Sequence, residues 1–459
     1  MGLLNASQQH IYTTVSNYQV LQRDFSTNTA IVKTNDGDTT TLPVGGPYSI
    51  NGADHVLVGD VFVMAGQSNM RGNGFYKDPW TDPPTSYLDH VNSSIHLFQC
   101  NETWTLAQEP THRLDQSIRA VNHNLSDPSV KDPNYHLLRG FSLGTSFATE
   151  YRKQMKNVPV GLIASAHGGT TLDDWSPDLM ENTTNPYNNT LYGAMLARLE
   201  KQENQVAGIL WYQGESDAAS TENAASYKKK FEKFITTTRE YLNDPQLPFL
   251  FVQIARQIQG GQDIDNEWSM IRDAQRQVND DYDVKRVGAV TTIDLPMDDR
   301  IHLSAIGQKR VGQRLARAAA NALLHDAAGV TSPSFDSVTY QETNVAENGD
   351  PSQGRQYTLL VKFKNMDEEA NSWKHVDRVF GFSIRDNQGN DNPAIYKARI
   401  EPDHKSVRLF ITDISLDSLK SKDHFLYYGY GMDPICNLET KDDIGLLAFG
   451  PEKIDFSAI

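Results

Sequence analysis

The sequence has little of several features that define other classes of protein. Only two of its 459 residues are cysteine, and neither has a neighbouring cysteine that would suggest a zinc site. Two cysteines are also too few for a disulfide framework, and the sequence leaves open whether Cys100 and Cys436 pair with each other. No apolar run approaches the length of about 18 residues that a membrane-spanning helix needs. We therefore expect no membrane span.

Positive charge is scarce as well. Lysine and arginine number 42 against 58 aspartate and glutamate residues, and the net charge of -16 is spread along the chain. Such a charge favours solubility and argues against nucleic acid as a partner. The first residues lack a basic segment followed by an apolar one, so no signal peptide is visible. Six Asn-x-Ser/Thr triplets nevertheless hint at a secreted or extracytoplasmic protein: Asn5, Asn92, Asn101, Asn124, Asn182 and Asn188.

The pattern of apolar and polar residues changes twice along the sequence, which predicts three domains. Residues 1–58 are short apolar-polar alternations with turn signals at Asp36-Gly37 and Asn51-Gly52, typical of hairpins in a small N-terminal β region. Residues 59–328 alternate between strand-like and helix-like stretches. Residues 329–459 return to β patterns and predict a β-sandwich.

The middle segment predicts an α/β domain with a parallel sheet. Continuous apolar runs of strand length lie at 61–65, 160–164, 206–212, 248–254 and 287–293. Strands of this kind are buried on both faces, as in a parallel sheet with helices on either side, which makes a three-layer αβα core. Helical patterns lie between these runs, and Ser304 is a candidate N-cap for the last of them. The aperiodic segment 72–135 predicts extended loops that form substrate walls over one sheet edge.

Polar blocks follow four of the predicted strands. Ser68 comes after the first, residues 165–175 after the second, 213–217 after the third, and 298–304 after the last. Because the carboxyl ends of parallel strands meet at one edge of a sheet, we expect these blocks to converge there.

The residue types in these blocks suit acyl transfer. A serine hydroxyl needs a base to take its proton, and histidine titrates near neutral pH. Asp299 stands three residues before His302, close enough to orient the imidazole in a tight turn. The backbone N–H of Ser68, a glycine N–H from Gly168-Gly169 and the amide of Gln213 are candidate oxyanion donors.

These blocks resemble a known family. "GQSNM", "HGGTTLDDW", "WYQGESD" and "DRIHLSAIGQKRVG" are similar to the conserved blocks of the SGNH hydrolases, in particular the carbohydrate esterases that include sialate O-acetylesterases and acetyl xylan esterases. "VLQRD", "GGPYSI" and "DPICNLET" extend the likeness to nearly the whole chain, although the N-terminal β region is shorter than usual. The resemblance implies a flavodoxin-like SGNH fold and no metal or organic cofactor. It also implies Ser68 as nucleophile, His302 as base, and Gly169 or Gly168 with Gln213 as oxyanion donors.

Several assignments stay open at this point. The resemblance allows either Asp299 or Glu215 as the acid of the triad, and proximity to His302 favours Asp299. Candidate substrate-binding residues are Gln67, Asn69, Arg71, Trp175 and Trp211. Core packing is the alternative for the two tryptophans, and a surface salt bridge is the alternative for Arg71 and for Arg139. His167 is expected to be structural or to line the pocket.

The predicted function is a serine esterase that removes O-acetyl groups from carbohydrate, with sialic acid as the first candidate. An acetyl xylan or other polysaccharide acetylesterase is the alternative within enzymes. A non-catalytic carbohydrate-binding protein on an esterase scaffold is the alternative of another class, and the presence of Ser68, Asp299 and His302 together argues against it. The oligomeric state is not predicted.

Overall fold

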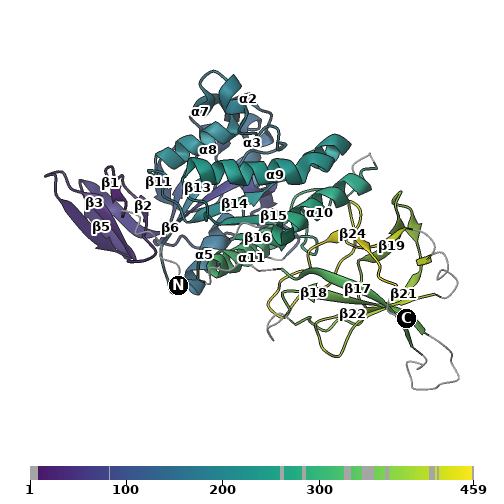
Figure 1. Cartoon of the computed structure of the whole chain (residues 1–459). Helices are drawn as coiled ribbons and strands as arrows, with labels where there is room; N and C mark the ends of the chain where they lie inside the picture. The colour runs from purple at the N-terminus through teal and green to yellow at the C-terminus, as the bar shows by residue number, and fades with distance from the viewer. Residues whose placement is uncertain are drawn as a thin grey trace.

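The fold is a mixed α/β structure with a central, mostly parallel sheet and additional C-terminal β-sheets (Figure 1). The computed structural model describes residues 9–81, 83–258, 263–281, 286–324, 332–343, 356–366, 372–412, 419–420 and 423–456. No helix within these ranges is long and apolar enough to cross a membrane. The triplet at Asn5 and the predicted boundary between residues 328 and 329 lie outside the described residues.

The central sheet has the spatial order β11-β10-β13-β6-β14-β15-β16. Its strands are β6 (Ala53–Gly66), β10 (Ile95–Phe98), β11 (Trp104–Leu106), β13 (Val160–Ala164), β14 (Gly208–Tyr212), β15 (Phe249–Gln253) and β16 (Val287–Thr291). All neighbours on this path are parallel except β10 and β11. The five predicted strands are confirmed, and every residue of β13 to β16 is buried, as continuous apolar runs indicate.

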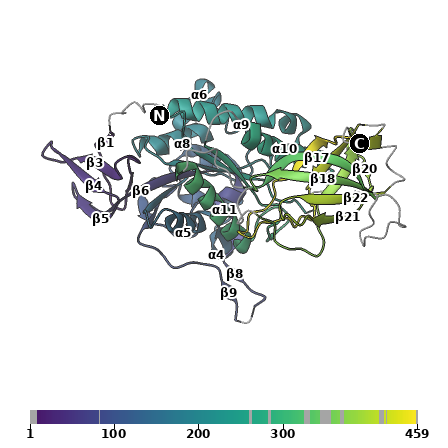
Figure 2. The same ribbon diagram turned by 60° about the horizontal axis from the view of Figure 1, so that its bottom comes forward.

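Helices cover both faces of this sheet. Figures 1 and 2 show α5 (Gly144–Gln154) and α11 (Ala305–Leu324) on one face, and α8 (Leu191–Glu200), α9 (Thr221–Tyr241) and α10 (Asp265–Asp281) on the other. Ser304 caps α11 as predicted, since its Oγ accepts the N–H of Gly307. With helical crossovers between parallel strands, the carboxyl ends of β6, β13, β14 and β16 all point to one edge.

The N-terminal β region is joined to the central sheet by one long strand. Its own strands are β1 (Ile11–Tyr12), β2 (Val20–Gln22), β3 (Thr29–Lys33), β4 (Thr39–Pro43) and β5 (Gly45–Ile50). The two predicted hairpins are confirmed as β3-β4 and β5-β6. The first half of β6 pairs with β2 and β5, and its second half pairs with β13 and β14.

The segment 72–135 contains more structure than its sequence predicts. It supplies β10 and β11 to the edge of the central sheet, an outcome that its lack of periodicity does not indicate. The short elements between β6 and β14 are α1 (Ser68–Arg71), β7 (Gly74–Phe75), β8 (Lys77–Asp78), β9 (Thr85–Ser86), η1 (Leu114–Gln116), α2 (Ala120–Asn124), α3 (Pro128–Lys131), α4 (Tyr135–Leu138), β12 (Arg139–Phe141), α6 (Leu179–Asn182) and α7 (Pro186–Asn189). A further short helix, η2 (Asp217–Ala219), follows β14.

The C-terminal part forms two four-stranded sheets, in the orders β17-β18-β22-β21 and β20-β19-β23-β24. Their strands are β17 (Ser334–Thr343), β18 (Gln356–Lys364), β19 (Phe382–Asp386), β20 (Asp391–Asn392), β21 (Ile395–Ile400), β22 (Val407–Ile411), β23 (His424–Tyr428) and β24 (Phe449–Lys453). Buried side chains of both sheets, including Val361 and Leu426, share one hydrophobic cluster. Cys100 and Cys436 are both free thiols and do not pair.

Candidate active site

Ser68 stands where β6 turns sharply into α1. The turn requires glycine at position 66, because its φ is +131° and a Cβ there would lie 2.2 Å from the carbonyl oxygen of Tyr212 on the neighbouring strand. Gln67 N–H then donates to that same carbonyl over 2.8 Å. The serine is thereby held at the carboxyl edge of the sheet, at the position where the sequence predicts it.

His302 and Asp299 reach Ser68 from the loop between β16 and α11. His302 Nε2 lies 2.9 Å from Ser68 Oγ, and His302 Nδ1 lies 2.9 Å from both carboxylate oxygens of Asp299. Asp299 Oδ1 also accepts the backbone N–H groups of Ile301 and His302, which makes the tight turn expected from the spacing of the two residues. Serine, imidazole and carboxylate therefore form a hydrogen-bonded chain across 234 positions of sequence.

The electrostatics of this chain keep the imidazole neutral and the carboxylate ionised. Burial lowers the pKa of His302 below its usual 6.5, and Arg71 and Arg139 lower it further, against the opposing effect of Asp299. Hydrogen bonds from His302, from the Ile301 N–H and from Arg139 hold the pKa of Asp299 far below its usual value, although burial acts in the other direction. At neutral pH, His302 Nε2 is thus able to accept the proton of Ser68.

Glu215 is not placed to act on His302. Its carboxylate is buried and accepts the Nδ2 of Asn69 over 2.7 Å. Desolvation raises the pKa of Glu215 to about 7, with no cation to compensate among its main influences. Of the two acids that the sequence leaves open, Asp299 is the one hydrogen-bonded to His302.

Of the predicted oxyanion donors, Gly168 and Gln213 are already engaged, whereas Ser68 and Gly169 are not engaged by any described residue. The N–H of Gly168 donates to Asp127 Oδ2 over 2.8 Å, so it is already engaged. The side-chain amide of Gln213 is fully buried and donates to the carbonyl of Thr170 and to Asp217. By contrast, within the described part of the chain the N–H groups of Ser68 and Gly169 have no acceptor, and both residues line the pocket.

Asn69 was expected to bind substrate, but its side chain hydrogen-bonds to the backbone of the two residues that flank His302. Its Nδ2 donates to the carbonyl of Ile301 over 3.2 Å, and its Oδ1 accepts the N–H of Leu303 over 3.1 Å. The residue is completely buried and does not line the pocket. Asn69 therefore links the turn at Ser68 to both neighbours of His302, which is a structural role.

The two tryptophans that were candidates for stacking on sugar lie in the core. Trp175 and Trp211 are each 0% exposed and pack edge to face, with ring centroids 5.3 Å apart. Trp175 Nε1 donates to Thr170 Oγ1 over 3.0 Å. Neither ring lines the pocket, so the core-packing alternative is the correct one for both. His167 is also buried, with its ring nitrogens against the carbonyls of Gly168 and Asn122, which fits its expected structural role.

A pocket of about 600 Å³ opens over Ser68 and His302. Its walls come from the turn at Ser68, the Gly168-Gly169 turn and the segment 126–139, so residues at both ends of the insert lie at the pocket, where the sequence predicts walls. The lining residues are Gln67, Ser68, Arg71, Asn73, Phe75, Ser126, Asp127, Pro128, Asp132, Asn134, Tyr135, Leu138, Arg139, Gly168, Gly169, Ser216, Ile301 and His302. Gln67 reaches the pocket as predicted, and its amide also contacts the turn at residues 214–216.

Both arginines at this pocket are already paired with carboxylates. Arg71 is 2% exposed, lies 3.2 Å from Asp127 through Nε and donates to the Tyr135 hydroxyl over 2.9 Å. Its Nη1 has no hydrogen-bond partner in the described ranges. Arg139 pairs with Asp299 at 2.8 Å in a partly exposed ion pair, so the salt-bridge alternative fits it better than the role of a free substrate ligand.

Asp127 and Tyr135 were missed by sequence reasoning. An aspartate followed by proline is an N-cap signal, and Asp127 does cap α3. That signal says nothing about contacts with Arg71 or Gly168, which lie 56 residues earlier and 41 residues later in the chain.

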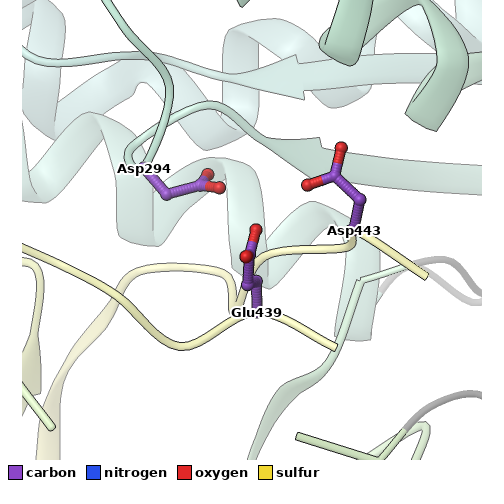
Figure 3. A group of neighbouring side chains, drawn as sticks. All are labelled: Asp294, Glu439 and Asp443. Atoms are coloured by element: carbon purple, nitrogen blue, oxygen red, sulfur yellow. The ribbon is translucent and has the colours of Figure 1, made fainter. Parts of the chain in front are cut away.

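One cluster of carboxylates elsewhere has the spacing of a metal site. Figure 3 shows Asp294, Glu439 and Asp443 converging, with one oxygen of each within 4.8 Å of the others. Arg310 pairs with all three, Arg314 pairs with Asp294 and Asp443, and Lys374 pairs with Glu439 at 2.9 Å. Three cations thus match three carboxylates, so the cluster is an ion-pair network rather than a ligand set awaiting a metal.

Comparison with known proteins agrees with this geometry. Residues 58–321 match the family described as carbohydrate esterase, sialic acid-specific acetylesterase. The chain is 29% identical over 273 residues to a probable carbohydrate esterase of Arabidopsis thaliana, a match that covers 56% of this chain and 89% of that protein. Among solved structures, a carbohydrate acetylesterase from Xanthomonas citri has the same fold, with a TM-score of 0.64 and 22% identity over 96% of this chain and 98% of the other. Because the family model spans more than half of the sequence, the chain belongs to this family of carbohydrate esterases.

Proposed function

We propose that the protein is a serine acetylesterase of the SGNH type that removes O-acetyl groups from carbohydrate, with Ser68 as nucleophile, His302 as general base and Asp299 as the orienting acid. The observation that carries the proposal is the pair of 2.9 Å contacts that join Ser68 Oγ to His302 and His302 to Asp299 at the floor of an open pocket. A carbohydrate-binding protein without activity has no use for that chain of hydrogen bonds.

In the first half of the proposed reaction, Ser68 Oγ attacks the acetyl carbonyl carbon while its proton passes to His302 Nε2. The bond from the acetyl carbon to the sugar oxygen then breaks, and His302 returns the proton to that oxygen. In the second half, water attacks the acetyl-enzyme and gives its proton to His302. The bond from the acetyl carbon to Ser68 Oγ breaks, the proton passes from His302 to that oxygen, and acetic acid leaves and ionises to acetate in solvent.

The negative charge on the carbonyl oxygen needs hydrogen-bond donors, and we assign this role to the N–H groups of Ser68 and Gly169. Both belong to the pocket lining, and neither N–H has an acceptor within the described ranges. Ser68 N–H is also at the first turn of α1, where backbone N–H groups point outward. One such donor is typically worth about 3–4 kcal/mol in the transition state.

Sialic acid is our first candidate for the sugar. The family description names it, and Arg71 lines the pocket with a guanidinium whose buried Nη1 has no hydrogen-bond partner in the described ranges, so a small movement would offer a donor to a carboxylate. A neutral acetylated polysaccharide such as xylan is the second candidate, because Asp127 and Asp299 already match the charges of Arg71 and Arg139. A matched pair of positive charges leaves no excess to attract an anionic sugar.

Acetate release from an aryl acetate by the wild type and by Ser68→Ala tests the reaction type. The Ser68→Ala variant should have no detectable turnover and should resist labelling by a fluorophosphonate that labels the wild type. Retained turnover in the folded variant would sink the assignment of Ser68. Acetate release from O-acetylated sialic acid and from acetylated xylan, measured side by side, then separates the two sugars.

A further inference from the structure

Asp127 joins three segments that meet beside the nucleophile. It is fully buried, and its Oδ1 accepts the N–H and Oγ of Ser129 at the start of α3, over 2.8 and 2.6 Å. Its Oδ2 accepts the N–H of Gly168 over 2.8 Å and lies 3.2 Å from Nε of Arg71. One carboxylate therefore links the pocket wall, the oxyanion turn and the helix that carries Ser68.

The contact with Gly168 fixes the direction of the next peptide. A Cβ on Gly168 would lie 2.3 Å from Asp127 Oδ2 and 3.4 Å from Ser68 Cβ, so the turn is held closely between the carboxylate and the nucleophile. Gly169 follows with a φ of +70°, a conformation that suits glycine. Because Asp127 engages the N–H of Gly168, the N–H of Gly169 is the one left for substrate.

Asp127 also contacts Arg71, which lies on α1 one helical turn after Ser68. The Arg71 guanidinium is held on one side by Asp127 and on the other by Tyr135, whose ring also lies under it at 4.9 Å. Without the carboxylate, the buried guanidinium would lose the one ion pair that it makes among the described residues.

We propose that Asp127 is a positioning residue of the esterase, which holds the Gly168-Gly169 turn against Ser68 and fixes Arg71 at the pocket wall. The proposal rests on the proposed function, since it assumes that Ser68 is acylated with the oxyanion at Gly169. It assigns a reaction-related role to the segment 126–139, beyond that of a wall.

The charge of Asp127 gives the proposal a second readout. The charged groups that act most strongly on His302 are Asp299, which raises its pKa, and Arg71 and Arg139, which lower it. Removing the negative charge at position 127 leaves Arg71 unmatched, so the pKa of His302 falls further. Since the base must be neutral, the acid limb of kcat/KM against pH then moves to lower pH.

Two substitutions of Asp127 separate its two contacts. Asp127→Ala removes the acceptor for Gly168 N–H, and we expect kcat/KM for an aryl acetate and the rate of fluorophosphonate labelling to fall about 100-fold, as for the loss of one oxyanion donor. Asp127→Asn retains an oxygen for that N–H, so we expect a loss below about tenfold, together with the shift of the acid limb to lower pH.

Asp174→Ala is the matched control. Asp174 accepts the N–H and Oγ of Thr171 in the same loop, each over 2.8 Å, and contacts neither Gly168 nor Arg71. We expect it to stay within about threefold of the wild type. The proposal would be overturned if kcat/KM fell equally in the Asp127→Ala and Asp174→Ala variants. It would also be overturned if folded Asp127→Ala retained the wild-type kcat/KM.

If Asp127→Ala does not fold, Asp127→Asn decides by itself, and an unchanged acid limb overturns the proposal. The Ser68→Ala variant distinguishes this failure from failure of the proposed function. An active Ser68→Ala protein contradicts the function, whereas an inactive one beside an unaffected Asp127 series contradicts the role of Asp127 alone.

Discussion

Arg139 Nη2 donates to Asp299 Oδ2 over 2.8 Å, on the same carboxylate that accepts from His302 Nδ1. Arg139 Nε donates in turn to the carbonyl of Asn73 over 2.9 Å, and the guanidinium lies 4.7 Å above the ring of Phe75. The residue is thus held in place by its surroundings and supports Asp299, the acid of the proposed triad. Its charge also lies close enough to His302 to lower the pKa of the imidazole.

We expect Arg139→Met to move the acid limb of kcat/KM to higher pH. The cation lowers the pKa of His302, so its loss raises that pKa and requires a higher pH for the neutral base. The acid limb should shift by about 0.5–1 pH unit. We also expect kcat/KM to fall about tenfold, because Asp299 is less well oriented without Arg139. Lys233→Met, which breaks the exposed pair with Asp178, is the control and should change neither quantity. A limb that stays in place or moves down would contradict the role of Arg139.

The pH profile of the wild type should itself report a depressed histidine. Because burial lowers the pKa of His302, we expect kcat/KM to rise with pH to a plateau, with its midpoint below 6.5. A midpoint clearly above 6.5 would mean that Asp299 outweighs burial and the two arginines.

Asp299→Asn and Glu215→Gln should separate the two candidate acids. Asp299 holds Nδ1 of His302, so its amide should lower acetate release about 10⁴-fold by disturbing the imidazole tautomer. Glu215 contacts Asn69 and not His302, and its amide should retain activity within about tenfold of the wild type. Steady-state acetate release from an aryl acetate measures both, and the reverse order of losses would make Glu215 the acid.

Glu215→Gln should also change how stability depends on pH. Burial raises the pKa of Glu215 from 4.5 to about 7, so the folded state binds its proton more tightly than the unfolded state does. This residue therefore favours folding most below about pH 4.5, and that contribution is lost as the pH rises to about 7, for a total of about 3 kcal/mol. Measured by urea unfolding, the free energy of unfolding of the variant should fall less between about pH 4.5 and 7 than that of the wild type. Parallel curves would mean that the buried carboxylate is not destabilised.

The parts of the fold and of the site that could be predicted from the sequence are those set by residues close together in the chain. The five central strands follow from continuous apolar runs, and Ser68, Asp299 and His302 follow from polar blocks placed after such strands and from the family resemblance of those blocks. The Asp299–His302 contact is itself local, which is why proximity in the sequence favoured the carboxylate that the structure places against His302.

The failures have a common cause in long-range contacts. In a strand buried on both faces, the pattern does not say which side chain points to the pocket, so Trp211 could not be distinguished from a sugar platform. The acceptor for Gly168 N–H comes from Asp127, in an aperiodic segment 41 residues away. Strands β10 and β11 were missed because four and three residues are too short to show alternation.

Trp211→Phe should affect stability and leave substrate binding alone. The indole is fully buried against Trp175 and Phe234, with centroids 5.3 and 4.6 Å away, so a smaller ring leaves a cavity. We expect the free energy of unfolding to fall by about 1–3 kcal/mol in urea titration, with KM for an acetylated sugar unchanged. A KM that rises several-fold at unchanged stability would restore the sugar-stacking role.

Arg310→Met should expose the charge of the carboxylate cluster formed by Asp294, Glu439 and Asp443. Arg310 lies on α11, which begins three residues after His302, and it bridges the loop before Asp299 to the C-terminal part of the chain. Removing this cation leaves three carboxylates facing two cations, so we expect the unfolding free energy to fall by about 1–3 kcal/mol.

The same variant tests whether the cluster prefers metal. Millimolar Ca²⁺ should leave the Tm of the wild type unchanged, because Arg310, Arg314 and Lys374 already match the three carboxylates. In Arg310→Met, only Arg314 and Lys374 remain to match the three carboxylates, and Ca²⁺ should recover part of the lost Tm. Lys309→Met, on the same helix but paired with exposed Asp89, is the control and should show neither effect. A wild-type Tm that rises with Ca²⁺ would instead identify the cluster as a cation site that competes with its own arginines.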